Sequence, residues 1–244
     1  MKINVISESG FFNLKEKFGG IHSAFINHVA LLKKENQEVV INSLGRADIV
    51  HLHSYGPFAL FKLLSSKEPT VVMTHDVPKT FVDSVKGARL LMPLITAYFR
   101  FFYNHADLVM ALNPFTKREL EGIGVKSKII VLSNPVNGAL FHKDENLRIK
   151  TREKYKILKN DFIVFGIGKQ IPRKGIGDFL QIAKKFPDFK FFWVGGKDVE
   201  ALSAQTPEQK HLIENPPQNV TLVGSVKYEE TVAFYNMADV FLFP

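Results

Sequence analysis

Short apolar segments alternate with helical stretches along the whole chain, and this alternation narrows the choice of fold more than any other feature. In the first half, apolar runs that favour strands lie at residues 3–7, 39–42, 49–53, 70–74, 108–111 and 128–132. Helical patterns lie between them at residues 21–34, 58–64, 89–103 and 114–121. Strands that alternate with helices are typical of parallel sheets built from βαβ units. We therefore predict an α/β fold with parallel sheets.

A second series of strands and helices follows a stretch rich in turn residues at 133–138. A charged segment at 143–156 begins this series, and its predicted elements occupy residues 162–165, 177–186, 189–194, 199–214, 220–223, 229–237 and 240–243. The break predicts two domains, residues 1–140 and residues 141–244. Because the last predicted strand ends the chain without a covering helix, we expect the natural protein to continue for about 60 residues, or two βα units.

The composition of the chain excludes several classes of functional site. The chain has 244 residues, of which 45% are hydrophobic and 23% charged, an ordinary globular balance. It contains no cysteine, which excludes a disulfide scaffold, a thiolate zinc site and a cysteine nucleophile. The first residues predict a strand rather than a secretory leader, so we expect a cytoplasmic protein. The net charge of +8 suits anionic partners, but no nucleic-acid-binding signature is present, and nucleic acid is not expected among them.

The stretch from residue 162 to residue 180 combines an apolar strand, a loop broken by glycines and the start of a helix. The loop contains three cations, Lys169, Arg173 and Lys174. Backbone N–H groups and the helix dipole attract anions at such a junction, and three cations favour a diphosphate. The spacing matches neither a Walker A motif nor a dinucleotide fingerprint. On this pattern alone, a solvated basic turn is as good an interpretation as an anion site.

Nine short motifs occur in an order that resembles the GT-B glycosyltransferases of family 4, and they cover nearly the whole chain. They lie at residues 19–21, 51–53, 71–76, 104–113, 131–137, 169–175, 192–196, 219–226 and 235–244. The resemblance implies two Rossmann-like domains whose parallel sheets face each other across a cleft, with the second domain truncated. It also implies transfer of a sugar from a nucleotide donor with retention at the anomeric carbon.

The resemblance implies that two loops hold the donor diphosphate. Gly19 and Gly20 match a glycine loop whose backbone approaches the diphosphate, which a side chain would block. Lys169 and Lys174 match two basic positions; the family commonly has arginine at the first, and lysine keeps the charge but loses the bidentate fork. Arg173 either compensates for that loss or faces solvent. Such cations stabilise the charge that grows on the β-phosphate, so neither a metal ion nor a cofactor is implied.

His75 and Val226 are the remaining site residues that the resemblance implies. His75 ends a predicted strand, where open α/β sheets have their active sites, and the matching histidine binds a donor or acceptor hydroxyl near the transferred sugar. A structural histidine is the alternative, and His51 and His53 are expected to shape the same rim. Val226 matches a position beside the nucleobase. The family's Glu-x7-Glu motif, which contacts the donor sugar and ribose, follows the strand at 240–243, and this chain ends before it.

The segment at 86–103 mixes apolar, aromatic and basic residues, which fits a core helix or a helix at an anionic membrane surface. Residues 1–140 contain 16 cations and 11 acids, a net charge of +5 (16 − 11). The compact first half resembles bacterial glycosyl-diacylglycerol synthases. This implies transfer of glucose or galactose from a UDP-sugar to a membrane lipid or glycolipid by a peripheral enzyme at the inner face of the cell membrane. The alternatives are a family-4 transferase of cell-surface polysaccharide synthesis and a non-catalytic sugar-nucleotide-binding subunit.

Overall fold

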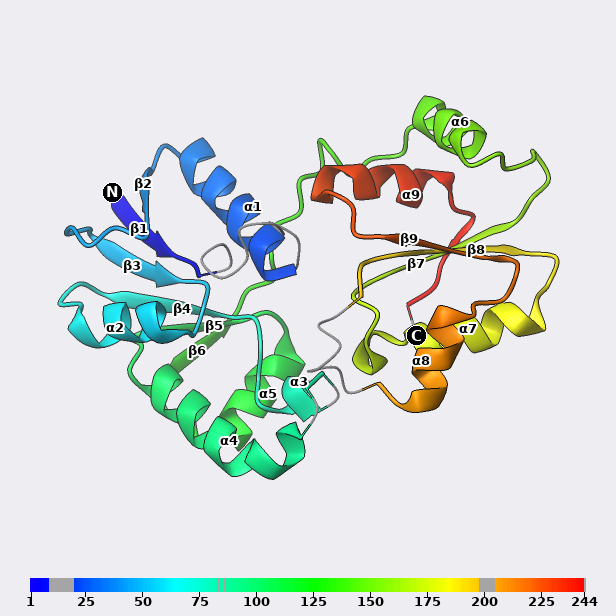
Figure 1. Ribbon diagram of the computed structural model, residues 1–244. Coiled ribbons are helices and arrows are strands. Elements are labelled where there is room, and N and C mark those ends of the chain that lie inside the picture. Colours follow the sequence, from blue (N-terminus) through cyan, green and yellow to red (C-terminus); the bar gives the residue numbers. More distant parts are fainter. Residues whose placement is uncertain (9–19, 83, 86, 198–204, 244) are drawn as a thin grey trace. The chain divides into compact units, whose positions relative to one another are not determined.

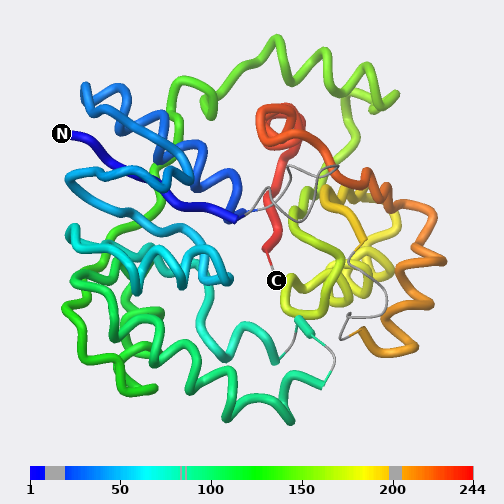
Figure 2. Tube along the Cα trace, turned by 60° about the vertical axis from the view of Figure 1, so that its left-hand side comes forward, coloured from blue at the N-terminus to red at the C-terminus, as the bar shows by residue number. Residues whose placement is uncertain are grey.

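The computed structural model describes residues 1–8, 20–82, 84–85, 87–197 and 205–243. The chain folds into two compact units. The first unit comprises Met1–Lys79 and Leu90–Asn137, and the second comprises Thr80–Arg89 and Gly138–Pro244. Figure 1 labels the elements of each unit, and Figure 2 follows the same chain as a continuous trace.

The first unit is built on a six-stranded parallel sheet with the strand order β2-β1-β3-β4-β5-β6. Its strands are β1 (Lys2–Ile6), β2 (Glu38–Ile41), β3 (Ile49–Leu52), β4 (Thr70–Thr74), β5 (Leu108–Ala111) and β6 (Lys128–Val131). The helices of this part of the chain are α1 (Gly20–Lys34), α2 (Pro57–Ser65), α3 (Lys79–Val82), α4 (Ala88–Asn104) and α5 (Pro114–Gly122).

The strand order of the first sheet reverses between β1 and β3. Right-handed crossovers then place α1 on one face of the sheet and α2, α4 and α5 on the other (Figure 1). Phe25 and Val29 of α1 pack against Ile3 and Val5 of β1 and bury that face. Ligands of open α/β sheets bind at the carboxyl ends of the strands where the order reverses. In this sheet, that position is beside the residues that follow β1 and β3.

The second unit is built on a four-stranded parallel sheet with the order β10-β7-β8-β9. Its strands are β7 (Ile163–Ile167), β8 (Lys190–Val194), β9 (Val220–Gly224) and β10 (Val240–Phe241). The helices are α6 (Glu145–Lys154), α7 (Ile176–Lys185), α8 (Pro207–Glu214) and α9 (Thr231–Met237), with 3-10 turns η1 (Pro172–Lys174) and η3 (Tyr228–Glu230). The α/β fold with parallel sheets is thus confirmed.

Two apolar cores flank the second sheet because successive residues of a strand point to opposite faces. Phe191 and Trp193 of β8 pack with the buried sides of α7 and α8. Phe192 and Val194 of the same strand pack with the buried side of α9. Phe179 of α7 meets Trp193 edge to face, with ring centroids 5.0 Å apart. The continuous apolar run of β8 therefore reflects burial on both faces, as parallel sheets require.

Most predicted elements agree with the structure to within one or two residues, but some segments differ. The charged segment at 143–156 contains the helix α6, which lacks the apolar periodicity that predicts a helix; Asp144 caps it by accepting from the N–H of Leu147 at 3.0 Å. The helix predicted at 199–214 begins at Pro207, after the capping residue Thr206, and residues 199–204 lie outside the described part. The last strand ends at Phe241.

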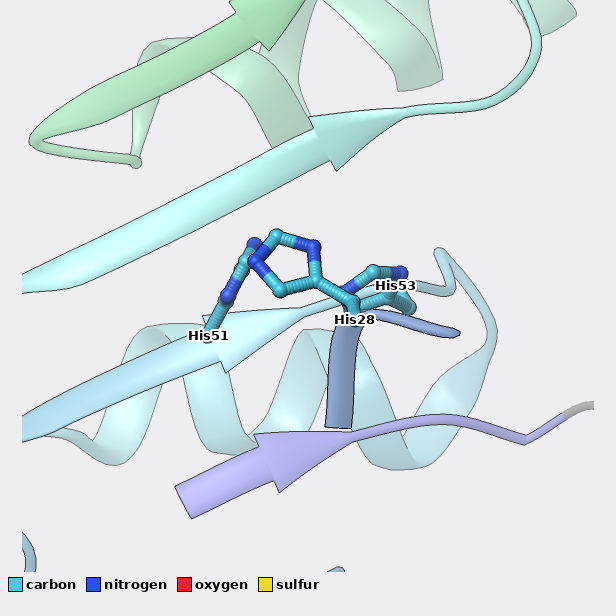
Figure 3. A group of neighbouring side chains, drawn as sticks. All are labelled: His28, His51 and His53. Carbon is cyan, nitrogen blue, oxygen red and sulfur yellow. The ribbon is translucent and has the colours of Figure 1, made fainter. Parts of the chain in front are cut away.

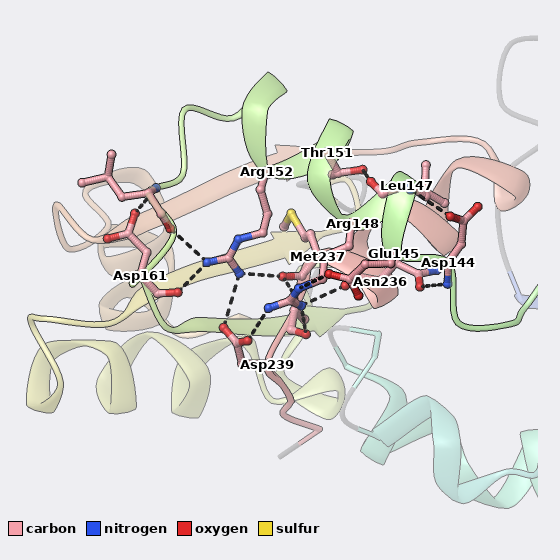
Figure 4. Close-up of polar contacts among 12 residues, drawn as sticks. Asp144, Glu145, Leu147, Arg148, Thr151, Arg152, Asp161, Asn236, Met237 and Asp239 are labelled. Carbon is pink, nitrogen blue, oxygen red and sulfur yellow. Dashed lines mark hydrogen bonds and ion pairs between the residues drawn. The ribbon is translucent and has the colours of Figure 1, made fainter.

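Two arginines of α6 tie this helix to the end of α9 and the start of β10 (Figure 4). Arg148 donates to the last carbonyls of α9 and to Asp239 Oδ1 at 2.6 Å. Arg152 donates to the carbonyl of Met237 at 3.1 Å and to two carbonyls before β7. Asp239 Oδ2 also accepts from the N–H of Ile163 at 2.7 Å. Burial by itself raises the pKa of Asp239, but this N–H and the two guanidiniums hold it below its ordinary value.

Replacing Arg152 with Met should lower the free energy of unfolding by about 2–4 kcal/mol, because buried carbonyls lose their donor and Asp239 loses a cation. Urea denaturation followed by the fluorescence of Trp193, in the same unit, measures this change. Lys150→Met is the matched control, since Lys150 is exposed on the same helix. Its effect should stay within about 0.5 kcal/mol. Equal losses in the two variants would contradict the importance of this network.

Candidate functional site

The loops that follow β7 and β8 pack backbone against backbone. The N–H of Gly168 donates to the carbonyl of Val194 at 2.9 Å, and the indole N–H of Trp193 donates to the carbonyl of Gly168 at 2.8 Å. Gly195 has a φ of +138°, and a Cβ added there would stand 1.9 Å from the carbonyl oxygen of Gly168. Only glycine allows this approach, so the loop after β7 is held in place by its neighbour.

The cations of the basic loop differ in their surroundings. Lys174 is half-buried, and its stem lies 3.1–3.2 Å from the position that a Cβ would take on Gly168. Its Nζ lies 5.6 Å from the centroid of the Phe243 ring, just beyond β10. Lys169 is exposed. Arg173 is exposed as well, and its Nε donates to Ser84 Oγ at 3.0 Å. Packing against Gly168 thus positions Lys174.

Helix α7 begins beside this lysine. Gly175, at its N-terminal boundary, has the left-handed φ of +71°, which lets the chain turn from η1 into the helix. Among the described residues, no side chain caps the N-terminus of α7. The first-turn N–H groups of α7 and the Lys174 ammonium therefore lie in one loop at the carboxyl end of β7. This arrangement is chemically suited to bind an anion.

Val226 lies in the loop that follows β9. The loops after β8 and β9 are joined, because the N–H of Gly195 donates to the carbonyl of Gly224 at 2.8 Å. Val226 is partly buried and packs against the apolar core under α9. The structure therefore places Val226 in the row of loops at the carboxyl edge of the sheet that also includes Lys169, Arg173 and Lys174.

In the first unit, His75 directly follows β4 and is half-buried. Its Nε2 lies 3.1 Å from Nδ1 of His53. Burial lowers the pKa of His75 to about 4, and the neighbouring Asp76 opposes the shift only in part. Asp76 Oδ2 accepts from the hydroxyl of Tyr55 at 3.0 Å, which fixes the loop after β4. The imidazole is therefore neutral at neutral pH and suited to hydrogen bonding rather than to carrying charge.

His28, His51 and His53 form a histidine cluster between α1 and β3 (Figure 3). His51 and His53 stand two residues apart and point to the face of the sheet that α1 covers, where His28 meets them. The ring centroids of His28 and His51 are 4.6 Å apart, as are those of His51 and His53. His51 and His53 are both buried beneath α1, and His53 also contacts His75; that they shape a rim beside His75 stays a prediction. His28 is not among the residues predicted from the sequence, where its only signal is its place on the apolar side of α1.

The histidine cluster is neutral because burial opposes the charged form of each ring. Burial lowers the pKa of His51 to about 3, with help from His28 and His75. Burial also lowers the pKa of His53 far below its ordinary value and lowers that of His28.

Glu8, two residues beyond the end of β1, has a structural role. The carboxylate of Glu8 accepts from the N–H of Phe58 at 2.8 Å and from the hydroxyl of Ser54 at 3.0 Å. It thereby caps α2, where a carboxylate favours the positive end of the helix dipole. A Cβ on Gly56 would lie 2.5 Å from Glu8 Oε2, so the glycine makes room for this cap.

The predicted glycines of the first domain are only partly described. Gly19 lies outside the described residues. Gly20 is the first residue of α1, and a Cβ added there would meet nothing within 4 Å among the described atoms. The described fold therefore gives no steric reason for glycine at position 20. Its approach to a diphosphate stays a prediction, as do the roles of the other predicted site residues.

Comparison with known proteins identifies both units. The family model described as Glycosyltransferase Family 4 matches residues 3–139, and the model described as Glycosyl transferases group 1 matches residues 148–244. The first match alone covers more than half of the chain.

Two curated relatives match nearly the whole chain. An alpha-galactosylglucosyldiacylglycerol synthase of Streptococcus pneumoniae is 29% identical over 100% of this chain and 66% of its own length. A processive diacylglycerol alpha-glucosyltransferase of Acholeplasma laidlawii is 27% identical over 93% of this chain and 68% of its own length. The chain thus spans about two thirds of each relative.

A crystal structure of the Anabaena protein HepE in complex with UDP and glucose has the same fold. It aligns with a TM-score of 0.70 at 17% identity and covers 100% of this chain and 74% of its own. At this identity the likeness supports the fold, which is that of the GT-B glycosyltransferases.

The neutral histidines make stability depend on pH. A buried neutral histidine contributes stability that is complete above the unfolded pKa of about 6.5 and is lost as the pH falls toward the folded value. For His51 and His75, with folded pKa values of about 3 and about 4, the loss runs from pH ~6.5 downward. We expect a slope of about 1.4 kcal/mol per pH unit for each of these histidines.

Urea denaturation in EDTA at a series of pH values, followed by circular dichroism, measures this slope. His51→Gln should reduce it by about one histidine's share. His105→Gln, at an exposed position of the same unit, serves as the control and should leave it unchanged. A slope that is the same in wild type and His51→Gln would contradict the assignment.

Proposed function

Because the chain belongs to glycosyltransferase family 4, we propose that it acts in the transfer of a hexose, glucose or galactose, from a UDP-sugar to a membrane lipid or glycolipid. The two curated relatives support a lipid acceptor, since their names state diacylglycerol products or substrates. The HepE structure, which contains UDP and glucose, supports a UDP-sugar donor. We further propose that the reaction retains the configuration at the anomeric carbon.

The observation that supports the donor site best is the packing of Lys174 at the start of α7. Its stem is fixed against Gly168, so its ammonium is preorganised beside the first-turn N–H groups of the helix. In the proposed reaction these groups bind the donor diphosphate and stabilise the charge that develops on the β-phosphate as the sugar leaves. Lys169 and Arg173 add charge from more exposed positions. This scheme requires no metal ion at the diphosphate.

The proposed role of His75 follows from its neutrality. A neutral imidazole can donate from one nitrogen and accept at the other, which suits a sugar hydroxyl. Its Nε2 is already engaged with His53, so Nδ1 is the atom that we assign to the hydroxyl. Val226 is proposed to line the nucleobase pocket, and Gly20 to admit the diphosphate to the backbone at the start of α1.

The proposal of a lipid acceptor is supported by α4, whose two halves differ in burial. Near its end Phe99, Phe102 and Tyr103 are buried, whereas near its start Leu90 is 86% and Leu94 is 71% exposed. Apolar side chains beside exposed cations are typical of a helix that lies in a membrane interface. Among the described residues no helix is both long and apolar enough to cross a membrane. We propose that α4 holds the protein on the inner face of the cell membrane.

Replacing Lys174 with Met should weaken UDP binding by about 10- to 100-fold, the range for losing a hydrogen bond to a charged group. Methionine keeps the apolar stem against Gly168 and removes the ammonium group. Isothermal titration of the purified chain with UDP measures the change. Lys184→Met removes an exposed lysine from the far end of α7 and should leave the affinity as it is. Unchanged UDP affinity in Lys174→Met would overturn the donor-site assignment.

Replacing both Leu90 and Leu94 with Ser should reduce binding to phosphatidylglycerol vesicles by tenfold or more. The reason is that the membrane interface then loses two apolar side chains that the proposal inserts into it. Replacing Arg89 and Arg100 with Gln should weaken the free energy of vesicle binding by about 1 kcal/mol per cation. Raising the salt concentration should also weaken vesicle binding. Vesicle sedimentation measures both.

Leu44→Ser is the control for the vesicle experiment, because Leu44 is 74% exposed elsewhere in the first unit. It should leave vesicle binding at the wild-type level. Binding that is indifferent to every α4 substitution would exclude α4 as the membrane contact and would favour a soluble acceptor, as in polysaccharide synthesis.

A further inference from the structure

The histidine cluster contains three buried nitrogen atoms that the described fold does not satisfy. Among the described residues, His28 Nδ1, His51 Nε2 and His53 Nε2 have no hydrogen-bond partner. The three side chains are at most 8% exposed. Buried polar atoms without a partner are rare and destabilising, and here three of them occur in one cluster. One shared partner would satisfy all three.

We propose that His28, His51 and His53 bind a divalent transition-metal ion, with Zn²⁺ as the expected occupant. Each histidine can direct one ring nitrogen into the cluster, and these nitrogens lie within 4.8 Å of one another (Figure 3). The site lies in the core of the first unit, between α1 and β3.

The hydrogen bond between His53 and His75 is consistent with this site. If His53 Nδ1 donates its proton to His75 Nε2, then His53 Nε2 carries a lone pair, and that is the atom without a partner. Histidine ligands of metals normally donate their other N–H to a fixed acceptor, which sets the tautomer. The same assignment leaves the proton of His75 on Nδ1, the atom proposed above to meet a sugar hydroxyl. Only this last link rests on the proposed function.

The ligand set selects the class of ion. Three imidazoles suit zinc, copper, nickel or iron, whereas magnesium and calcium prefer oxygen ligands. Burial keeps the rings neutral, which is the form that binds metal. Nitrogens about 2.0–2.1 Å from a tetrahedral zinc stand about 3.3 Å apart, so the rings close in by somewhat more than 1 Å when the ion binds. Three protein ligands leave a fourth position for water.

Zinc titration of the EDTA-stripped, dialysed chain tests the proposal. Competition with a chromogenic chelator should give one site per chain, and Zn²⁺ should raise the melting temperature. His51→Gln and His28→Gln should each weaken binding by tenfold or more and abolish the rise in melting temperature. His105→Gln removes an exposed histidine of the same unit and should bind zinc as the wild type does.

Absence of a zinc site in the wild type, or equal affinity in all variants, would overturn the proposal, and the second result would indicate adventitious surface binding. Circular dichroism checks that the variants fold. If both cluster variants misfold, Co²⁺ added to the wild type decides. The intense visible absorption of a tetrahedral Co²⁺ site supports the cluster, whereas the weak spectrum of six-coordinate Co²⁺ refutes it. UDP binding is measured in parallel, so that failure of the donor site is distinguishable from failure of the metal site.

Discussion

The parallel alignment of the strands is the constraint on which the rest of the structure depends. Within each sheet all carboxyl ends meet at one edge, and the loops that follow them must share that edge. His53 and His75 meet because they follow β3 and β4, which are neighbours in the first sheet. The loops after β7, β8 and β9 meet for the same reason in the second. The strand order alone therefore brings together loop residues that are far apart in sequence.

Two polar clusters of the chain differ in whether their atoms have hydrogen-bond partners. Arg148, Arg152 and Asp239 are charged, and each finds several partners, so the ends of α6, α9 and β10 are held together by satisfied bonds. The histidine cluster is neutral and keeps nitrogens without partners among the described residues. A fully paired network contributes to stability, whereas a partly satisfied one weakens it unless something else occupies the space. The arginine network is thus complete as a structural element, whereas the histidine cluster has nitrogens that a ligand could engage.

Sequence patterns predicted the strands and most helices because apolar periodicity records burial directly. The sequence did not predict helix α6, because Arg148 and Arg152 stabilise it by donating to carbonyls of α9. Contacts with residues nearly 90 positions away leave no local signal in the sequence. The cations of the basic loop were visible in the sequence, but the fixed position of Lys174 depends on Gly168 and Phe243, which only the fold brings together. His28 was missed because a histidine among apolar residues looks like any other core position until β3 is placed beneath α1.

The contrast along α4 is hard to explain by packing within the first unit alone. A helix that served only to cover the sheet would be apolar on one side over its whole length and polar elsewhere. Here Phe102 is fully buried near the end of the helix, while Leu90 and Leu94 stand in solvent near its start. Exposed leucines in a row lower solubility and contribute nothing to the core, so their presence calls for a partner that shields them. The lipid surface proposed for α4 is such a partner, and an acceptor dissolved in it would bring the protein to that surface.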